Sequence, residues 1–316
     1  MVSDNLLEFA AKIYDFDKAT LSFISNSTNQ IYVFQKSRKY YILRFSNGIL
    51  SHTKAEMEWL FYLSKNNIRV GLPLKTIHGE LVTSMQDSGK NFIITSFAVV
   101  TGMPWDKNNP QKWNNQIFYN WGKTMGDIHH ITKDFVFSSD VVTRDTFNGR
   151  FALSDSVKTC PSVNAIVEDL ISEIMELPKD KNSYGLIHND MHQWNFHVDE
   201  NNINVFDFDD SLYGWYALDI GIALYHGLWW GRKDNDGNDF TNNIIKNFLD
   251  GYLSANKLSD FWIAKIPMFM TFRQICKFSW FFDPTNIDEH QRERIYNIEN
   301  NILFTDCKID FSLFKQ

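Results

Sequence analysis

Cysteine is scarce in this sequence: Cys160, Cys276 and Cys307 lie far apart and form no C-x-x-C pair. This usage argues against a disulfide framework or a zinc knuckle and favours reduced thiols, so we expect a cytoplasmic protein. No apolar run reaches the length of a membrane span, and the best stretch, residues 92–100, is too short and is interrupted by polar residues. The first residues lack the basic segment and apolar run of a signal peptide.

An excess of basic residues is also lacking. The chain has 31 Lys and Arg against 38 Asp and Glu, which gives a formal net charge of −7. A nucleic-acid groove needs a clustered basic face, so we expect neither a nucleic-acid nor a membrane partner, and the oligomeric state stays open. With 316 residues, 44% hydrophobic and 22% charged, the chain is predicted to be globular, as one very large domain or two packed lobes.

The first hundred residues predict a small antiparallel sheet with one helix. Strands are expected over residues 20–25, 30–36, 40–45 and 92–97, the second and third forming a hairpin. A helix is expected over about 53–65. Regular patterning stops at residues 100–104, so we place a lobe boundary there and expect a nucleotide-binding lobe over 1–99.

The remainder, residues 100–316, is expected to be a larger and mostly helical lobe that carries catalysis and the substrate. Helical periodicity indicates five helices, at 119–131, 162–176, 218–230, 242–254 and 260–282. One exception is a pair of short alternating segments, 196–198 and 203–206, joined by polar turn residues, which predicts a hairpin. The fold class predicted from this order of elements is α+β.

This hairpin is flanked by the residues most informative about chemistry. Before it stands the pattern H-x-D-x-x-x-x-N, formed by His188, Asp190 and Asn195, and after it stands Asp207. A tight hairpin brings its ends together, so Asn195 and Asp207 are expected to face each other and to suit Mg²⁺, a hard cation that takes oxygen ligands. Asp190 would accept a proton from an attacking hydroxyl, and His188 would orient the loop by hydrogen bonding.

Residues 185–221 resemble the family of aminoglycoside phosphotransferases, choline kinases and type II homoserine kinases, whose fold is protein-kinase-like and bilobal. The likeness is carried by the H-x-D-x-x-x-x-N pattern, by Asp207-Phe208-Asp209-Asp210 and by Asp219-Ile220-Gly221. The resemblance implies an enzyme that transfers the γ-phosphoryl group of ATP to a hydroxyl of a small molecule. It also implies that Asp190 is the catalytic base, that Asn195 and Asp207 hold Mg²⁺, and that Asp219 braces the catalytic loop.

The resemblance implies two partners in the first half. Arg44 occupies the place on the third strand where relatives hold the nucleotide phosphates with a cation, often a lysine. Glu56 shares the inward face of the following helix with Leu60 and Leu63, where it is expected to pair with Arg44. The alternative for Glu56 is a capping box that begins at Thr53 and needs no catalysis.

The sequence contains no G-x-G and no Walker A pattern. The phosphate loop would therefore be the polar turn 25–29, with the hydroxyl groups of Ser27 and Thr28 and the backbone N–H groups as donors. The resemblance places the adenine against the backbone near Ser96 and Ala98.

The acceptor site is the least specified part. Asp209 and Asp210 are candidates for substrate or second-metal contacts, although both also suit a simple turn. Trp194 and Tyr225 are candidate wall residues among aromatics that are mainly core. Carboxylates beside aromatic rings would suit an amine-bearing acceptor, such as an aminoglycoside, a choline-like or a homoserine-like molecule.

Three alternatives remain open. A Ser/Thr protein kinase would share the fold, but no long activation segment separates Asp207 from Asp219. A metallohydrolase would use the cluster of His188, Asp190 and His192, which leaves the hairpin of Asn195 unexplained. A nucleotide sensor without catalysis would need none of these residues to act.

Overall fold

The computed structural model describes all residues except 139–142, 150–152, 233–237, 305–308 and 316. The chain divides into two compact units. The first comprises residues 1–102, 134–144 and 204–209, and the second comprises 103–133, 145–203 and 210–316. The expected functional division into lobes 1–99 and 100–316 stays a prediction.

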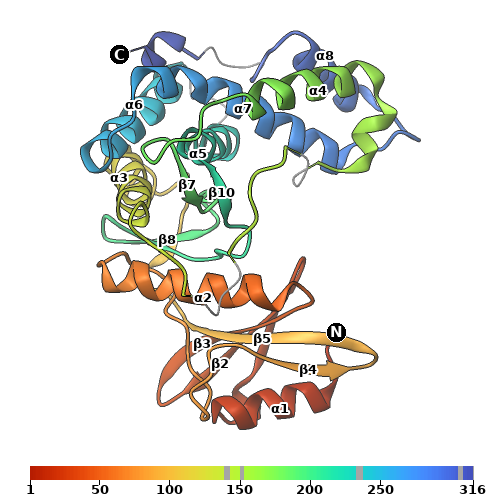
Figure 1. The fold of residues 1–316 in the computed structure, drawn as a ribbon, viewed down its shortest axis with the longest axis vertical. Coiled ribbons are helices and arrows are strands. Elements are labelled where there is room, and N and C mark those ends of the chain that lie inside the picture. Colours follow the sequence, from red (N-terminus) through yellow and green to blue (C-terminus); the bar gives the residue numbers. More distant parts are fainter. Residues whose placement is uncertain (139–142, 150–152, 233–237, 305–308, 316) are drawn as a thin grey trace. The chain divides into compact units, whose positions relative to one another are not determined.

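The first unit is built on a five-stranded antiparallel sheet with the order β1-β2-β3-β5-β4 (Figure 1). Its strands are β1 (Ser22–Asn26), β2 (Gln30–Lys36), β3 (Lys39–Ser46), β4 (Thr83–Asp87) and β5 (Lys90–Ala98). Helices α1 (Asp4–Tyr14) and α2 (Leu50–Lys65) lie on opposite faces of this sheet. The four predicted strands are confirmed, whereas β4 was not predicted.

Helix α1 is a second helix of this unit and was not predicted. The hydroxyl of Ser3 caps its first turn by accepting a hydrogen bond from the N–H of Leu6. Its apolar face joins the core that Leu43 and Phe45 form on one side of β3. Because side chains alternate along a strand, Arg44 points to the other side, toward α2.

Helix α2 begins at Leu50, before the predicted start at Thr53. Ile49 occupies the N-cap without a side-chain hydrogen bond, and the hydroxyl of Thr53 donates to the carbonyl of Ile49 from inside the first turn. The capping-box alternative for Glu56 is therefore wrong, because Thr53 is not the residue that precedes the helix.

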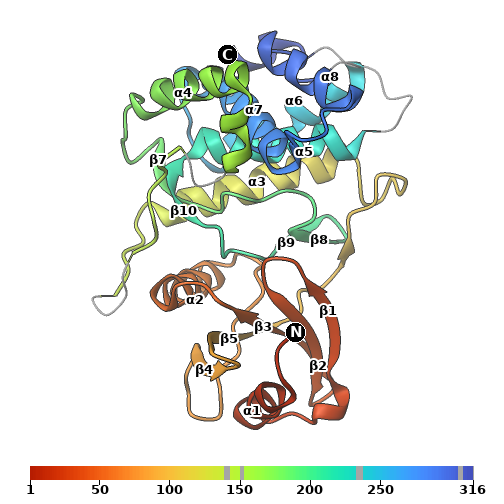
Figure 2. The same cartoon turned by 90° about the vertical axis from the view of Figure 1, so that its right-hand side faces the viewer.

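The second unit is mostly helical. Its helices are α3 (Asn115–Thr132), α4 (Pro161–Met175), α5 (Tyr216–Gly231), α6 (Asn238–Ala255), α7 (Asp260–Phe281) and α8 (Glu289–Glu299). Five of them were predicted within a few residues, and α8 was not. Helices α4, α7 and α8 lie side by side (Figure 1 and Figure 2) and share an apolar cluster centred on Val163, Ile275 and Ile298.

Helices α3 and α6 pack unusually closely through glycines. A Cβ atom on Gly122 of α3 would lie 1.9 Å from the carbonyl oxygen of Phe248, and one on Gly251 of α6 would lie 1.9 Å from that of Tyr119. Only residues without a side chain allow this approach of two backbones.

Short strands position the loop that carries the predicted catalytic residues. Strand β7 (Tyr184–Ile187) pairs antiparallel with β10 (Leu212–Trp215), and β6 (Met103–Pro104) pairs with β8 (Phe196–Asp199). Strand β9 (Asn202–Val205) completes the predicted hairpin with β8 and is the element at which the chain passes from the second unit into the first. The loop 188–195 thus runs from β7 to β8.

None of the described helices combines the length and apolar character needed to cross a lipid bilayer. Cys160 and Cys276 are buried thiols outside any disulfide. Cys307, the third predicted thiol, lies outside the described residues.

Candidate active site

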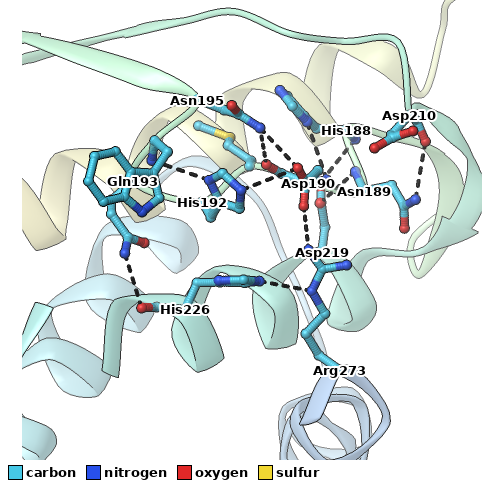
Figure 3. A network of polar contacts seen from close by, with 12 residues as sticks. His188, Asn189, Asp190, His192, Gln193, Asn195, Asp210, Asp219, His226 and Arg273 are labelled. Carbon is cyan, nitrogen blue, oxygen red and sulfur yellow. Dashed lines mark hydrogen bonds and ion pairs between the residues drawn. The ribbon is translucent and has the colours of Figure 1, made fainter. Parts of the chain in front are cut away.

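The loop between β7 and β8 is held in place by one buried carboxylate. Asp219, in the first turn of α5, accepts hydrogen bonds from the backbone N–H groups of His188 (3.1 Å) and Asn189 (2.8 Å) (Figure 3). Its Oδ2 atom also lies 3.0 Å from Nε2 of His129. Asn189 itself adopts a left-handed backbone conformation (φ 66°), which turns the loop sharply before Asp190. The predicted brace by Asp219 is confirmed.

His188 and Asn195 both contact Asp190. The backbone N–H of Asp190 donates to Nδ1 of His188 (3.3 Å), as expected for a histidine that orients the loop. The Nδ2 atom of Asn195 donates to the backbone carbonyl (2.9 Å) and to Oδ2 (3.0 Å) of Asp190. This use of the amide nitrogen leaves Oδ1 of Asn195 as the atom that can ligate a cation.

Two further side chains surround the carboxylate of Asp190: Arg273, which was not predicted, and His192, which was named only in the metallohydrolase alternative. Nη2 of Arg273 on α7 lies 2.5 Å from Oδ1, and Nε2 of His192 lies 3.3 Å from Oδ2 (Figure 3). Burial lowers the pKa of His192 to about 4, against the attraction of Asp190, so this imidazole is neutral at pH 7. Because its Nδ1 accepts from the N–H of Trp194 (3.2 Å), its proton sits on Nε2 and points at Asp190.

Arg273 is held by a second histidine. Its Nε donates to Nε2 of His226 (2.9 Å), and burial, with the charge of Arg273, lowers the pKa of His226 well below its usual value. A neutral imidazole is the form that can accept this bond. A buried arginine needs an anionic partner. An arginine inside a long apolar segment, as here, is a sequence signal that would have indicated Arg273 as a candidate site residue.

The first unit contains a second polar cluster, around Arg44. Nη1 and Nη2 of Arg44 donate to the two carboxylate oxygens of Glu56 at 3.0 and 2.5 Å, and Nε donates to Thr95 (3.2 Å). Burial opposes the charge of Arg44, but Glu56 outweighs it and raises the pKa of the guanidinium. The predicted ion pair is confirmed; its contact with a nucleotide stays a prediction.

Two carboxylates crowd together next to Arg44. Burial, followed by repulsion from Asp209, raises the pKa of Asp207 well above its usual value, whereas Arg44 and the hydrogen bonds from Asp207 and Asn29 outweigh burial and lower the pKa of Asp209. Nδ2 of Asn29 lies 2.7 Å from Oδ2 of Asp209. Asp209 is thus stabilised as a carboxylate and Asp207 is not, and a divalent cation would stabilise the ionised form of Asp207.

The segment of Asp207 and Asp209 is held by a ring contact and by a hydrogen bond. The ring of Phe208 is fully buried against Trp59 of α2, with ring centroids 5.2 Å apart, and the guanidinium of Arg144 donates to the carbonyl of Asp209. Asp207 has a left-handed backbone conformation (φ 68°). Such a conformation in a non-glycine residue is typical of functional sites.

The remaining predicted nucleotide contacts lie on the sheet. Ser27 and Thr28 are exposed in the turn between β1 and β2. On β5, the carbonyl of Ser96 accepts from Leu74 (2.8 Å) and the N–H of Ala98 donates to Leu72 (2.8 Å). These bonds join β5 to residues 72–74, which lie outside the five strands of the sheet. The predicted contact of Ser96 and Ala98 with adenine stays a prediction.

The predicted acceptor contacts are spread over the second unit, apart from Asp209 in the first. The ring of Trp194 is 55% exposed and stands edge-on to Trp105. Tyr225 is buried and lines a cavity beside α8. The carbonyl of Asp210 accepts a hydrogen bond from Nδ2 of Asn189 (3.1 Å), which links this residue to the catalytic loop.

The described residues contain no group of three or more His, Cys, Asp or Glu side chains arranged to hold a metal ion. His188, Asp190 and His192 make the hydrogen bonds given above instead, so the geometry does not support the metallohydrolase alternative.

Comparison with known proteins identifies the class. Residues 20–259 match the model of the phosphotransferase enzyme family, known as APH, and the chain belongs to this family. The chain is 29% identical over 314 residues to amicoumacin kinase of Bacillus subtilis (strain 168), covering 95% of this chain and 91% of the relative.

Solved structures agree with this assignment. The amicoumacin kinase hAmiN, in complex with AMP-PNP, Ca²⁺ and Ami, is similar with a TM-score of 0.89 and 27% identity, over 98% of this chain and 96% of that one. The spectinomycin phosphotransferase APH(9)-Ia, in complex with ADP and its antibiotic, shares the fold with a TM-score of 0.61 and 14% identity, over 99% and 98% of the chains. The predicted kinase-like α+β fold and the phosphotransferase activity are confirmed, and the predicted cofactors agree with the nucleotide and cation complexes of these relatives.

Proposed function

We propose that this phosphotransferase moves the γ-phosphoryl group of Mg·ATP to a hydroxyl group of a small molecule, with Asp190 as the catalytic carboxylate. The observation that carries the proposal is the arrangement of loop 188–195. Asp219 fixes its backbone, while Asn195 and Arg273 fix the carboxylate of Asp190. In a member of this family, such rigidity suits a residue that must align a reacting group.

Asp190 orients the acceptor hydroxyl and takes its proton as the reaction proceeds. A bond forms between the acceptor oxygen and the γ-phosphorus, and the bond from that phosphorus to the bridging oxygen of ADP breaks. The proton on Asp190 then passes to solvent. The donors around Asp190 keep its carboxylate in one position, so proton transfer needs no rearrangement of the protein.

The nucleotide is assigned to the first unit. Arg44, held by Glu56, would bind the α- and β-phosphates, with Ser27 and Thr28 in the phosphate turn and Ser96 and Ala98 beside the adenine. Support comes from the buried Arg44–Glu56 pair, which presents a fixed guanidinium.

Asn195 and Asp207 are assigned to Mg²⁺. The donor set fits: Asp207 is a buried acid crowded by Asp209, and the Oδ1 of Asn195 is left for a cation when Nδ2 binds Asp190. When bound, Mg²⁺ offsets the charge that develops on the phosphate oxygens. Asp209 keeps the nearby Asn29 and Arg144 in place through its own hydrogen bonds.

The first acceptor to test is amicoumacin, because two similar proteins are named as amicoumacin kinases. The net charge of −7 supports a small-molecule partner rather than nucleic acid or a membrane. A cytoplasmic location is supported by the free thiols of Cys160 and Cys276.

The test is phosphoryl transfer from ATP to amicoumacin, followed by mass spectrometry of the product. A gain of one phosphoryl group that requires Mg²⁺ and disappears in Asp190→Asn supports the proposal. If a panel of hydroxyl compounds, amicoumacin included, gives no product although Mg·ATP binds, the protein is a nucleotide-binding protein and the proposal is wrong.

A further inference from the structure

One residue of α5, His226, contacts three side chains that lead to the catalytic carboxylate. Its ring nitrogen Nε2 accepts a hydrogen bond from Nε of Arg273 (2.9 Å), and its backbone carbonyl accepts one from Nε2 of Gln193 (3.2 Å) (Figure 3). Its ring also packs against that of His192, with the centroids 4.8 Å apart. Gln193 and His192 belong to the catalytic loop, and Arg273 is paired with Asp190. His226 is thus linked to Asp190 through each of its neighbours.

The contact with Arg273 fixes the protonation of the His226 ring. Because an arginine N–H can only donate, Nε2 of His226 is unprotonated, and the neutral ring carries its proton on Nδ1. Burial, followed by the charge of Arg273, lowers the pKa of His226 well below its usual value, which keeps the ring neutral. Nδ1 is buried without a hydrogen-bond partner among the described residues. A buried N–H without an acceptor costs stability, so this arrangement serves something other than the stability of the fold.

His226 also determines how Arg273 meets the catalytic carboxylate. With Nε bonded to His226, the guanidinium reaches Asp190 through Nη2, which lies 2.5 Å from Oδ1. The other carboxylate oxygen, Oδ2, is left to Asn195 (3.0 Å) and to His192 (3.3 Å). The two oxygens of Asp190 are therefore held by different donors, in an end-on contact with Arg273.

Loss of the acceptor at Nε would change this geometry. The guanidinium of Arg273 would then have two parallel donors free, Nε–H and Nη2–H, and such a pair binds both oxygens of a carboxylate side by side. This side-on contact would turn the carboxylate of Asp190 away from Asn195 and His192. A misplacement of about 1 Å is enough to slow a reaction about 10²-fold.

We propose that His226 is a positioning residue for phosphoryl transfer: it accepts the Nε–H of Arg273 and so keeps the carboxylate of Asp190 in the orientation that receives the acceptor hydroxyl. The inference rests on the proposed function, because it needs Asp190 to be the catalytic carboxylate. It adds to that site a residue of α5 that acts through another side chain.

The test separates the hydrogen bond of His226 from its packing. His226→Phe keeps an aromatic ring beside His192 but has no acceptor. His226→Gln loses the ring but keeps an acceptor, since Oε1 of glutamine lies about as far from the backbone as Nε2 of histidine. Turnover is measured as ADP released from Mg·ATP with amicoumacin as acceptor, and with water alone. We expect kcat to fall about 10²-fold in His226→Phe, with the KM for ATP unchanged, and no more than about fivefold in His226→Gln.

A double-mutant cycle identifies the residue through which His226 acts. If the effect passes through Arg273, His226→Phe should cost nothing further in the background Arg273→Gln, whereas a role in packing would lower kcat by the same factor in both backgrounds. The matched control is Ser279→Ala on α7. The buried hydroxyl of Ser279 donates to the carbonyl of Cys276 (2.7 Å) and accepts from the N–H of Ser154 (3.1 Å). This change removes buried hydrogen bonds from the helix of Arg273 and should leave kcat unchanged.

The tautomer of His226 is checked without turnover. Long-range ¹⁵N–¹H NMR spectra of the full chain, labelled at histidine, identify the ring nitrogen that carries the proton. His226→Gln, which lacks this ring, assigns the signal. We expect the proton of His226 on Nδ1 at neutral pH.

The inference is overturned if His226→Phe retains full kcat, if His226→Gln is impaired as much as His226→Phe, if the losses multiply in the double variant, or if the proton lies on Nε2. A cooperative thermal transition shows that each variant is folded. Should His226→Phe not fold, Arg273→Lys takes its place: one ammonium group cannot bond both His226 and Asp190, so the same fall in kcat is expected, and full activity would overturn the inference. No ADP from the unmodified chain with either acceptor would refute the proposed function and this inference together, whereas turnover that is insensitive to His226 refutes this inference alone.

Discussion

Asp207 and Asp190 are carboxylates of the same motif region, yet their surroundings are opposite. Asp207 in the first unit is buried beside a second acid, Asp209, which raises its pKa. Asp190 in the second unit faces donors only: Arg273 and Asn195, with the N–H of His192 beside them. The charge of Asp207 therefore needs a cation from outside the protein, whereas the charge of Asp190 is balanced by donors of the protein itself.

This difference separates two tasks that both use an acid. A carboxylate that must accept and release a divalent ion needs an excess of negative charge around it. One that must align a hydroxyl needs a fixed position, which its own hydrogen bonds provide. Three predictions test this contrast, beginning with the largest effect.

Replacing Asp190 should abolish turnover and leave nucleotide binding intact. In Asp190→Asn, turnover should fall by about 10³-fold, because the group that takes the hydroxyl proton is lost. The rise in melting temperature with Mg·ATP should persist, since the nucleotide is assigned to the first unit. Steady-state kinetics and thermal melts check both parts, and a variant with full activity would contradict the role of Asp190.

Breaking the ion pair of the first unit should cost stability. Glu56→Gln removes the charge that compensates the buried Arg44 and should lower the free energy of unfolding by about 3–5 kcal/mol. Urea unfolding provides the measurement. Glu58→Gln, two residues along the same helix and less buried, is the control and should change stability by about 1 kcal/mol or less. Equal effects of the two variants would show that the pair is not a structural necessity.

Replacing Asp207 should have opposite effects on stability with and without Mg²⁺. A raised carboxyl pKa means that ionisation costs stability at pH 7, so Asp207→Asn should melt higher than the unmodified chain in EDTA. With Mg·ATP at a hundred times its dissociation constant, the unmodified chain should gain about 2.7 kcal/mol and the variant nothing. Differential scanning calorimetry in both buffers decides; a variant that retains the full gain would disprove the cation role.

The sequence was sufficient to predict site residues that belong to a short, recognisable motif. The spacing of His188, Asp190 and Asn195 before a hairpin led to the loop, and the family resemblance of this region implied its brace, Asp219. The inward face of one amphipathic helix led from Glu56 to Arg44. Both contacts join neighbouring elements of the chain, 31 and 12 residues apart, so a short stretch of sequence contains both partners.

The helices and the residue that were not predicted were missed for different reasons. Helix α1 has the N-cap Ser3 and the apolar spacing of Leu6, Ala10 and Ile13, so its signal was present in the sequence. Helix α8 buries only Asn297 and Ile298, and so polar a helix has no periodic signal. Arg273 reaches Asp190 from a position 83 residues away, a contact that only tertiary packing creates.

Helix α1 also decides how this protein can be handled at the bench. Its residues from Leu6 to Tyr14 cover an apolar sheet face that includes Phe34 and Phe45. A chain shortened to begin at Asp15 would expose that face to water, and exposed apolar sheets of this kind associate with one another. Insoluble aggregates rather than a smaller active enzyme are the expected product of such trimming, so purification tags belong ahead of an intact α1.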